Sequence, residues 1–444
     1  MIREAASGRP QRRGPAGLLA LLLAVAFRLP LAGDPGSLAD RLPAAVADAQ
    51  RLVESIRGVP FRGPVASAVL PEKELRRVLE KKLAEDLPVS FDRYAASLVA
   101  LGLVPPDRDL KKRMLTLYTR QVAGFYDPDE KKFFVVPERS DEAASNAAGF
   151  GAGAEGLLEK ALLTHELTHA LQDRRLDLVP RLEKLKENSD ASLALQAFLE
   201  GEATAVMMEA ILAGLPPNAR EATSADQLLA SMTQIASGGV DGAEGVPDYF
   251  VKELLFPYTA GTAWIEERRS HGGWMVVDAT YDHPPETTVE ILDPSRTGAP
   301  RPLLPFSAWP SASDLPERAF PLYTDRLGAF VLRCLLEEAG ASDAAGLALS
   351  WEDDRILFWE RSAEPGGPVG FLWSLRLASS GTARRIAALL APFYEAHAPG
   401  AASVHVDGDL VRVVRRAVAP PRGPLPGAPA LTAPAEASAP PARR

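Results

Sequence analysis

Two histidines and a glutamate in LLTHELTHALQD, residues 162–173, have the spacing of a catalytic metal site. His165 and His169 are four residues apart, so on a helix both imidazoles lie on one face and can bind the same ion. Imidazole and carboxylate ligands that leave one position open for water are typical of hydrolytic Zn²⁺. Glu166 would lie beside that position, where it can act as a general base.

The rest of the chain must show whether this motif is a metal site or a buried helix that carries two core histidines. The chain has only 6 histidines, and two of them have the required spacing. Strand-like sequence precedes the motif, where a substrate-binding edge strand is expected. The motif also has the apolar surroundings that hold a helix inside a domain, namely Leu162, Leu163, Leu167 and Leu171. These flanks favour a metal site.

A third ligand must come from outside the motif. A third histidine in the same helix segment is excluded, because position 175 is Arg175. The downstream segment FLEGEATAVMME, residues 198–209, offers Glu200 and Glu202. Two residues apart on a helix, these side chains point in directions about 200° apart, so only one of them faces the metal.

These segments resemble known zinc peptidases. HELTHALQD resembles the zinc helix of thermolysin-like peptidases, and LEGEAT resembles the NEGFAT-type ligand segment of gluzincin aminopeptidases. The resemblance implies that Glu200, before the glycine, is the third zinc ligand, with Glu202 as the alternative. It also implies that Thr204 lies behind the ligands. Thermolysin-like enzymes have an aspartate at that point, so the segment is nearer to the aminopeptidase pattern.

The wider chain, over about residues 110–360, resembles an uncharacterised group of exported HExxH proteins. The shared segments are GFYDPDEKKFFVV, HELTHALQD, LEGEAT, GGWMVVDATYDHPPETTVEIL and WEDDRI, in that order. This resemblance implies a gluzincin-like architecture and brings no substrate. Asp293 stands where the related pattern has a histidine, so any role of that histidine is absent or reassigned.

Zinc peptidases usually add a tyrosine or histidine that stabilises the oxyanion of the tetrahedral intermediate. Asp173, four residues after His169, either orients a ligand imidazole or forms a surface cap or salt bridge. The sequence does not choose among five candidates for the oxyanion donor, which are Tyr126, Tyr258, His271, Tyr281 and His283.

Composition and the N-terminus restrict the class of protein. The formal net charge is −9 and no long basic stretch lies outside the N-terminus, which argues against a nucleic-acid binder. Residues 1–33 are predicted to be a signal peptide or N-terminal anchor, because several arginines precede the apolar run AGLLALLLAVAF at 16–27. A mitochondrial-type presequence or an unprocessed arm is the alternative. We expect an exported protein whose only membrane contact is through this segment.

Periodicity predicts the elements that position the motif. Residues 34–120 are expected to form a helical region, which acts either as a prosegment or as a packing subdomain. Within it, helices are predicted over 37–58, 72–87, 90–102 and 107–120, and a strand over 64–70.

The core around the motif is predicted to span residues 121–300. QVAGFYDPDEKKFFVVP, residues 121–137, predicts a β-hairpin, because an Asp-Pro-Asp turn separates two short apolar runs. Helical patterns follow at 192–214 and 256–292, with a loop-like stretch at 237–249 between them.

The remaining segments are predicted to be a linker at 301–320, a small α+β unit at 321–418 and a disordered Pro/Ala-rich tail at 419–444. The lone cysteine, Cys334, excludes an intrachain disulfide and is predicted to be a core residue. In WEDDRI, Asp353 and Asp354 are interpreted as a folding feature rather than a second metal site.

The predicted fold class is α+β: a mainly helical zincin-like core with a short β-sheet beside the HExxH helix, plus the smaller C-terminal unit. The expected function is hydrolysis of peptide or protein substrates, with one Zn²⁺ held by His165, His169 and Glu200, and Glu166 as general base. The alternative is a non-proteolytic zincin-fold protein that serves as an envelope binding or assembly factor. A helical scaffold without metal is the third interpretation.

Overall fold

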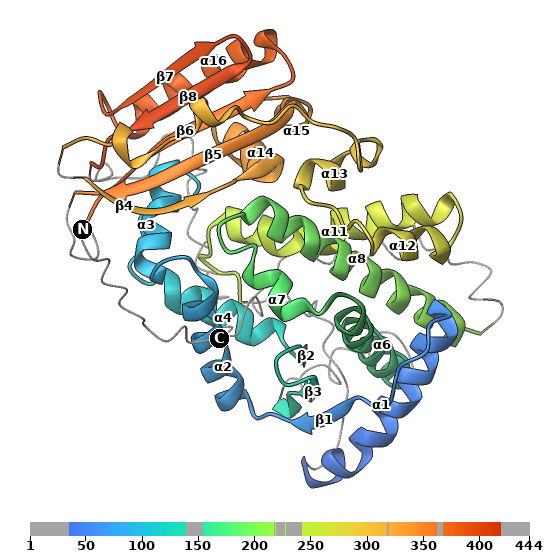
Figure 1. Ribbon diagram of the computed structural model, residues 1–444. Coiled ribbons are helices and arrows are strands. Elements are labelled where there is room, and N and C mark those ends of the chain that lie inside the picture. The colour runs from blue at the N-terminus through green and yellow to red at the C-terminus, as the bar shows by residue number, and fades with distance from the viewer. Residues whose placement is uncertain are drawn as a thin grey trace, which may run out of the picture.

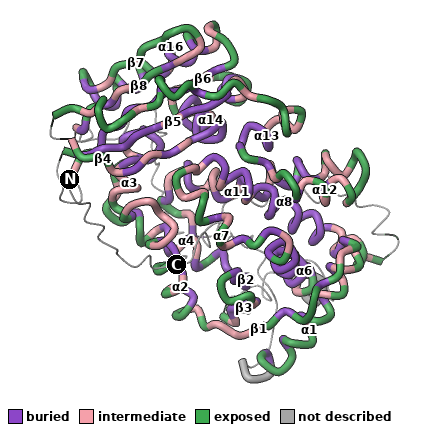
Figure 2. Tube along the Cα trace, viewed as in Figure 1, coloured by how far each residue is buried: buried purple, intermediate pink, exposed green. Residues whose placement is uncertain are grey.

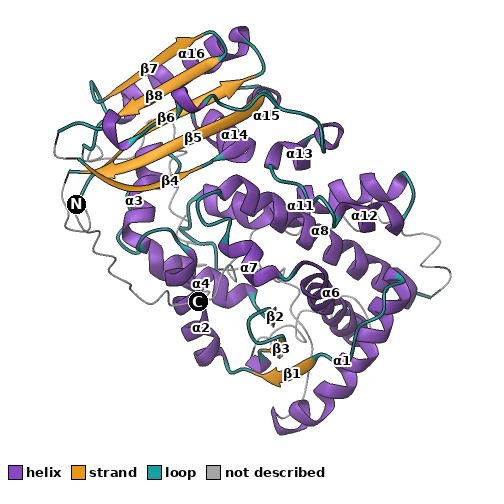
Figure 3. Ribbon diagram, in the orientation of Figure 1, coloured by secondary structure: helices purple, strands orange, loops and turns teal. Residues whose placement is uncertain are grey.

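The computed structural model describes residues 35–138, 154–216, 218, 227, 242–317, 319–361 and 367–418. The predicted signal segment and the predicted Pro/Ala-rich tail lie outside the described residues. The described chain is α+β, with mostly helical structure and two small sheets (Figure 3). Within these ranges, no helix combines the length and the apolar character needed to cross a bilayer.

The N-terminal region contains the predicted helices and strand, with ends that shift by a few residues. Its helices are packed through apolar stripes, such as Leu75, Leu79 and Leu83, which are buried. The elements are α1 (Pro35–Arg57), β1 (Ala66–Val69), α2 (Glu72–Asp86), α3 (Phe91–Leu101) and α4 (Leu110–Gln121).

The predicted hairpin is confirmed as β2 (Gly124–Asp127) and β3 (Lys132–Val135), which pair antiparallel. Asp127 stabilises the turn by accepting hydrogen bonds from the backbone N–H groups of Asp129 and Glu130. On its other side β3 pairs in parallel with β1, so the order is β1-β3-β2 and β2 is an edge strand of the described sheet. This edge lies against the helix that carries the HExxH motif.

Three long helices form the centre of the molecule: α6 (Ala154–Leu176), α8 (Ser189–Gly214) and α11 (Asp248–Ser270). Figure 2 shows α8 and α11 buried along much of their length. Because α8 is covered on all sides, its sequence is apolar around the whole helix rather than along one stripe. The shorter helices α7 (Leu178–Glu183), α12 (Trp274–Thr280) and α13 (Thr288–Leu292) connect and cover them.

The helix expected from residue 256 begins earlier, at Asp248. Pro247 occupies the position before it, and the carboxylate of Asp248 lies in the first turn, where it favours a helix start. The last residues of the stretch expected to be loop-like, 237–249, are therefore helical.

The C-terminal unit is a five-stranded antiparallel sheet in the order β4-β5-β6-β8-β7, packed with helices (Figure 1). The segment 301–320 contains two short 3-10 turns, Phe306–Ala308 and Ala312–Asp314, and ends at the first residue of β4. The elements are β4 (Phe320–Asp325), α14 (Gly328–Glu338), α15 (Ala344–Ala348), β5 (Trp351–Glu360), β6 (Val369–Leu377), α16 (Ser380–His397), β7 (Ala402–Asp407) and β8 (Leu410–Arg415).

Two sequence predictions are met inside this unit. Cys334 is buried and unpaired by any disulfide. Asp354 accepts hydrogen bonds from the indole N–H groups of Trp351 and Trp373, at 2.8 and 2.9 Å. Its carboxylate also accepts the backbone N–H groups of Leu327 and Gly328, where α14 begins. These bonds agree with a folding role for the WEDDRI segment.

Candidate metal centre

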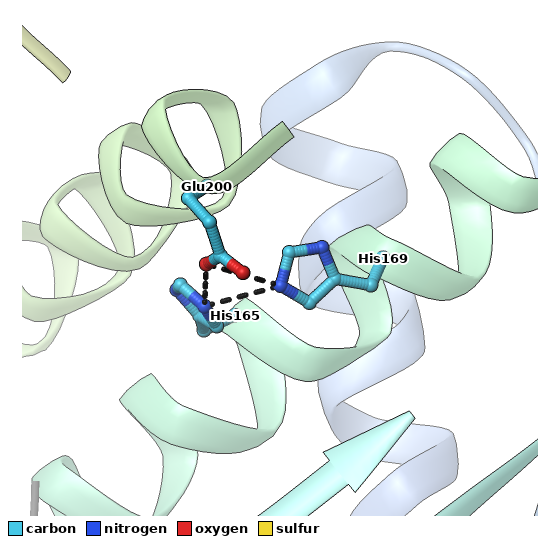
Figure 4. Close-up of side chains that lie close together, drawn as sticks. All are labelled: His165, His169 and Glu200. Carbon is cyan, nitrogen blue, oxygen red and sulfur yellow. Dashed lines mark hydrogen bonds and ion pairs between the residues drawn. The ribbon is translucent and has the colours of Figure 1, made fainter. Parts of the chain in front are cut away.

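Three side chains from two helices converge on one point. His165 and His169 lie on α6 and Glu200 lies on α8, and Figure 4 shows the two rings and the carboxylate directed toward one another. The Nε2 atoms of the histidines are 3.2 Å apart, and Glu200 Oε2 is 3.1 Å from His165 Nε2 and 3.4 Å from His169 Nε2. In the described part of the chain this is the group of side chains whose spacing could hold a metal ion.

These distances fit a tetrahedral ion. Zinc–nitrogen and zinc–oxygen bonds of about 2.0–2.1 Å place neighbouring ligand atoms about 3.3 Å apart in a tetrahedron. All three residues are at most 1% exposed. Glu200 Oε1 has no hydrogen-bond partner, an uncommon state for a buried polar atom. The residues present therefore suit a bound cation.

The electrostatics of the cluster indicate one shared positive charge in the absence of an ion. Burial lowers the pKa of His165, whereas at His169 the same effect of burial is outweighed by the carboxylate of Glu200, which raises the pKa to about 9. Burial by itself would raise the pKa of Glu200, but the two histidines hold it below its ordinary value. A divalent cation would replace the proton as the partner of this carboxylate.

A chain of hydrogen bonds fixes the ring of His169. Its Nδ1 is 2.8 Å from Gln172 Oε1, and the amide of Gln172 donates to the Leu199 carbonyl at 2.8 Å and to Glu202 at 2.9 Å. Glu202 therefore lies behind the cluster, and Glu200 is the glutamate of the two that lies close to both histidine Nε2 atoms. Arg57 Nε donates to Glu202 at 2.7 Å, and both of these side chains are fully buried.

Gln172 and Arg57 are site residues that the sequence reasoning did not identify. The role of Gln172 could have been predicted from the sequence, because this residue follows His169 by one helical turn and its amide can reach that ring. Arg57 has no such signal, since it lies on α1 and meets Glu202 only through the fold.

Glu166 is buried beside the three ligands. One carboxylate oxygen accepts the backbone N–H of Tyr126 on β2 at 3.0 Å, and the other has no partner. Burial raises the pKa of Glu166 to about 8, with Glu200 adding to the effect and His169 opposing it. The side chain that the motif assigns to proton transfer thus lies between the ligand cluster and the edge strand.

Tyr258 is the candidate oxyanion donor that lies at the cluster with a free hydroxyl. Its ring stacks on His165 with centroids 6.2 Å apart, and its buried hydroxyl has no hydrogen-bond partner. Burial, together with the carboxylates of Glu200 and Glu166, raises its pKa well above the ordinary value, so the hydroxyl keeps its proton.

The other candidates lie elsewhere. The hydroxyl of Tyr126 donates to Asp173 at 2.8 Å, and the hydroxyl of Tyr281 donates to Glu202. His271 and His283 are exposed at the surface.

The two residues expected to support the ligands also have definite positions. Asp173 accepts hydrogen bonds from Tyr126, from Lys131 at 2.7 Å and from the backbone N–H of Leu178 at 3.0 Å. It thus forms an ion pair with the half-exposed Lys131, and its contacts are not with a ligand imidazole. Thr204 is buried one turn after Glu200, and its hydroxyl has no partner.

Comparisons with protein-family models, with characterised proteins and with solved structures found no match to this chain. What the geometry establishes is a buried group of two histidines and a glutamate that can hold a metal ion, in an α+β protein.

Proposed function

We propose that this chain is a zinc-dependent peptidase with a zincin-like core of the gluzincin type. The observation that carries the proposal is the arrangement of three converging ligand atoms with the unpaired carboxylate oxygen of Glu166 next to them. His165 Nε2, His169 Nε2 and a carboxylate oxygen of Glu200 would hold the ion. Two imidazoles and one carboxylate favour Zn²⁺ and match the ligand set of hydrolytic zinc sites.

Zn²⁺, when bound there, supplies Lewis-acid polarisation and lowers the pKa of water. Glu166 takes the proton from the attacking water and passes it to the leaving amine. The hydroxyl of Tyr258 donates a hydrogen bond to the oxygen of the peptide carbonyl as negative charge develops on it. Gln172 holds the ring of His169 in the required orientation.

The edge strand β2 supports a peptide as the substrate. In the antiparallel pair, the hydrogen bond from Val136 to Ala123 sets the alternation, so the backbone groups of Gly124 and Tyr126 point away from β3. The Tyr126 N–H already reaches Glu166. An extended substrate that adds to this edge would pass beside the general base. The N-terminal sequence further supports export of the enzyme.

Metal analysis is the first experiment. We expect one zinc ion per chain in the purified protein, and a loss of zinc in His165→Ala. His271→Ala is the matched control. This histidine is exposed, so the zinc content of the variant should equal that of the wild type. Absence of stoichiometric zinc, or zinc that is unaffected by His165→Ala, would contradict the proposal.

Glu166→Gln separates catalysis from binding. This variant should retain zinc but lose peptide hydrolysis by a factor of about 10² to 10⁴, the usual contribution of a positioned general base. Retained zinc with an unchanged cellular phenotype would instead favour the non-proteolytic binding or assembly role.

A further inference from the structure

A pocket of about 180 Å³ lies at the N-terminal ends of α8 and α11, next to the metal centre and not part of it. Its walls come from six helices and combine apolar side chains with polar ones. Residues from α2, α3, α4 and α7 line it together with those from α8 and α11. Typical wall residues are Leu83, Met114, Leu182, Leu193, Phe250 and Leu254.

Two helical stripes connect this pocket with the candidate metal centre. On α8, Leu193 and Gln196 line the pocket, and Glu200 follows Gln196 by four residues on the same face. On α11, Leu254 lines the pocket, and Tyr258 follows it by four residues. Four residues correspond to about 6 Å along a helix. The pocket therefore begins one helical turn from the third ligand and from the candidate oxyanion donor.

The pocket residues on α4 lie close in sequence to the edge strand β2 as well. Met114 and Tyr118 on α4 line the pocket, and α4 ends at Gln121, just before β2. The α4–β2 segment and the α8–α11 pair thus bound both the pocket and the metal centre. A peptide on the edge of β2 would have a side chain within reach of the pocket.

Glu253 is one of two carboxylates that line this pocket, the other being Asp86. The carboxylate of Glu253 accepts a hydrogen bond from the hydroxyl of Tyr249 at 2.9 Å, and the side chain is only partly buried because it lines the cavity. Among the described residues, no lysine or arginine forms an ion pair with it. Lys186, the cation that lines the pocket, pairs with Glu183 at 2.9 Å instead.

The charge of Glu253 is poorly compensated. Burial raises the pKa of its carboxyl to about 7, while the Tyr249 hydroxyl opposes the shift and Asp325 adds to it. The hydroxyls of Tyr94 and Tyr118 lie in the field of the same carboxylate. A cation bound beside Glu253 would supply the missing partner.

We propose that this pocket is a specificity subsite that accepts a basic side chain of the substrate, lysine or arginine. The apolar walls would cover the methylene stem, and the carboxylate of Glu253 would pair with the cationic end. The proposal rests on the peptidase function proposed above, since it names the substrate class of that same site.

The first experiment compares internally quenched peptides that differ at one position, with lysine or norleucine there, scanned across the cleavage site. At one position we expect the lysine peptide to be cleaved with a kcat/KM at least about tenfold higher, as a charge-assisted hydrogen bond in a shielded pocket provides. Glu253→Gln should remove this preference, so that the ratio of the lysine rate to the norleucine rate falls to about one. The matched control Glu267→Gln, at the far end of α11, should retain it. Cleavage without any preference for lysine would overturn the subsite.

Binding to the Glu166→Gln protein, measured by fluorescence anisotropy with the same peptides, separates the two proposals. Tighter binding of the lysine peptide that depends on Glu253 supports the subsite even if the wild type hydrolyses no peptide, which would contradict only the peptidase. Equal binding of the lysine and norleucine peptides would contradict the subsite and leave the peptidase to its own test.

Discussion

The ring of His169 is held by a relay of polar side chains that ends at a buried cation. Gln172 contacts the ring, Glu202 holds Gln172, and Arg57 neutralises Glu202. An unpaired carboxylate at the position of Glu202 would be strongly unfavourable, because the site excludes water. The arginine therefore makes it possible for a second buried glutamate to lie two residues from Glu200, on another side of α8.

Tyr258→Phe tests the assignment of the oxyanion donor. The hydroxyl has no partner in the structure, so its removal should leave folding and zinc content unchanged. The kcat for peptide hydrolysis should fall by about 10² to 10³, with little change in KM, because the donor acts on charge that develops in the transition state. Steady-state kinetics on the zinc-loaded protein measure the effect.

Tyr126→Phe is the comparison for that variant. Its hydroxyl binds Asp173, so the kcat should change much less. Full activity in Tyr258→Phe would remove Tyr258 from the mechanism.

The sequence predicted some residues of the site better than others, for reasons of geometry. The four-residue spacing of His165 and His169 follows from the helix period alone. The choice between Glu200 and Glu202 depends on how α8 is rotated against α6, which spacing does not determine. Arg57 reaches the site across 145 positions of sequence, so only the tertiary fold brings it there.

At the scale of elements, the close contact of α8 and α11 determines how Glu200 and Tyr258 face the metal centre. The helices touch through Gly201 and Gly261. A Cβ on Gly261 would lie 2.1 Å from the Ala197 carbonyl oxygen, and one on Gly201 would lie 2.3 Å from the backbone of Gly261. Only hydrogen fits at these two positions, because the obstructing atoms are backbone.

Gly261→Ala should therefore destabilise the protein, although glycine to alanine inside a helix ordinarily stabilises by up to about 1 kcal/mol. Overpacking of this kind costs roughly 1–3 kcal/mol, so the urea midpoint should fall. Zinc affinity should fall as well, because the helices that carry Glu200 and Tyr258 must separate. Gly381→Ala in α16, where an added Cβ meets only Ser379 Oγ at 3.7 Å, should not lower the midpoint. A raised midpoint in Gly261→Ala would contradict the packing described.

Element prediction succeeded where a helix has one polar face or where a turn motif separates two strands. The N-terminal helices have such a face, whereas the strands of the hairpin are almost fully buried and were predicted from the Asp-Pro-Asp turn between them. The expected ranges agree with α2 and with β2–β3 to within a few residues. α8 has no polar face, so the hydrophobic periodicity of its sequence is weak. Its burial on all sides could therefore not be predicted from the sequence and is known only from the structure. The start of α11 was wrong because an exposed-looking, glycine-rich sequence directly precedes Asp248.

At the scale of the whole molecule, the N-terminal helix α1 packs against the elements that carry the site and supplies one of its side chains. Residues of α1 share an apolar cluster with α6 and the small sheet, including Val53 and Leu167. Arg57, the last residue of α1, pairs with Glu202 and with Asp278 at 2.7 Å each. Removal of α1 would leave Glu202 without its arginine, so this contact favours the packing subdomain over a prosegment that is cut away.

The contact between the helical core and the C-terminal unit contains a buried carboxyl whose protonation should affect stability. Asp190, in the first turn of α8, accepts the backbone N–H of Thr288 at 2.8 Å and its hydroxyl, both on Oδ1. Its backbone N–H donates to the Arg326 carbonyl at 3.0 Å, and its other oxygen, Oδ2, has no partner. Burial raises the pKa of this carboxyl to about 7, against hydrogen bonds from Thr288 that lower it.

The sign of the pH dependence follows from that shift. In the unfolded chain the pKa is the ordinary 3.8, so between about pH 4 and pH 7 the folded protein keeps a proton that the unfolded chain has lost. The free energy of unfolding should therefore fall as the pH rises through this window, by at most about 1.4 kcal/mol per pH unit from this group, and level off above it.

Asp190→Asn should remove this share of the slope and stabilise the protein at pH 8. The amide oxygen can keep both hydrogen bonds from Thr288, and the NH₂ group takes the place of the unpartnered Oδ2. Urea unfolding from pH 4 to 8 measures the difference, and Asp92→Asn, on an exposed first turn of α3, should leave the slope as in the wild type. If Asp190→Asn has the wild-type slope, or is less stable at pH 8, the carboxyl is ionised in the folded protein and the contact between the two units is stabilised by its charge.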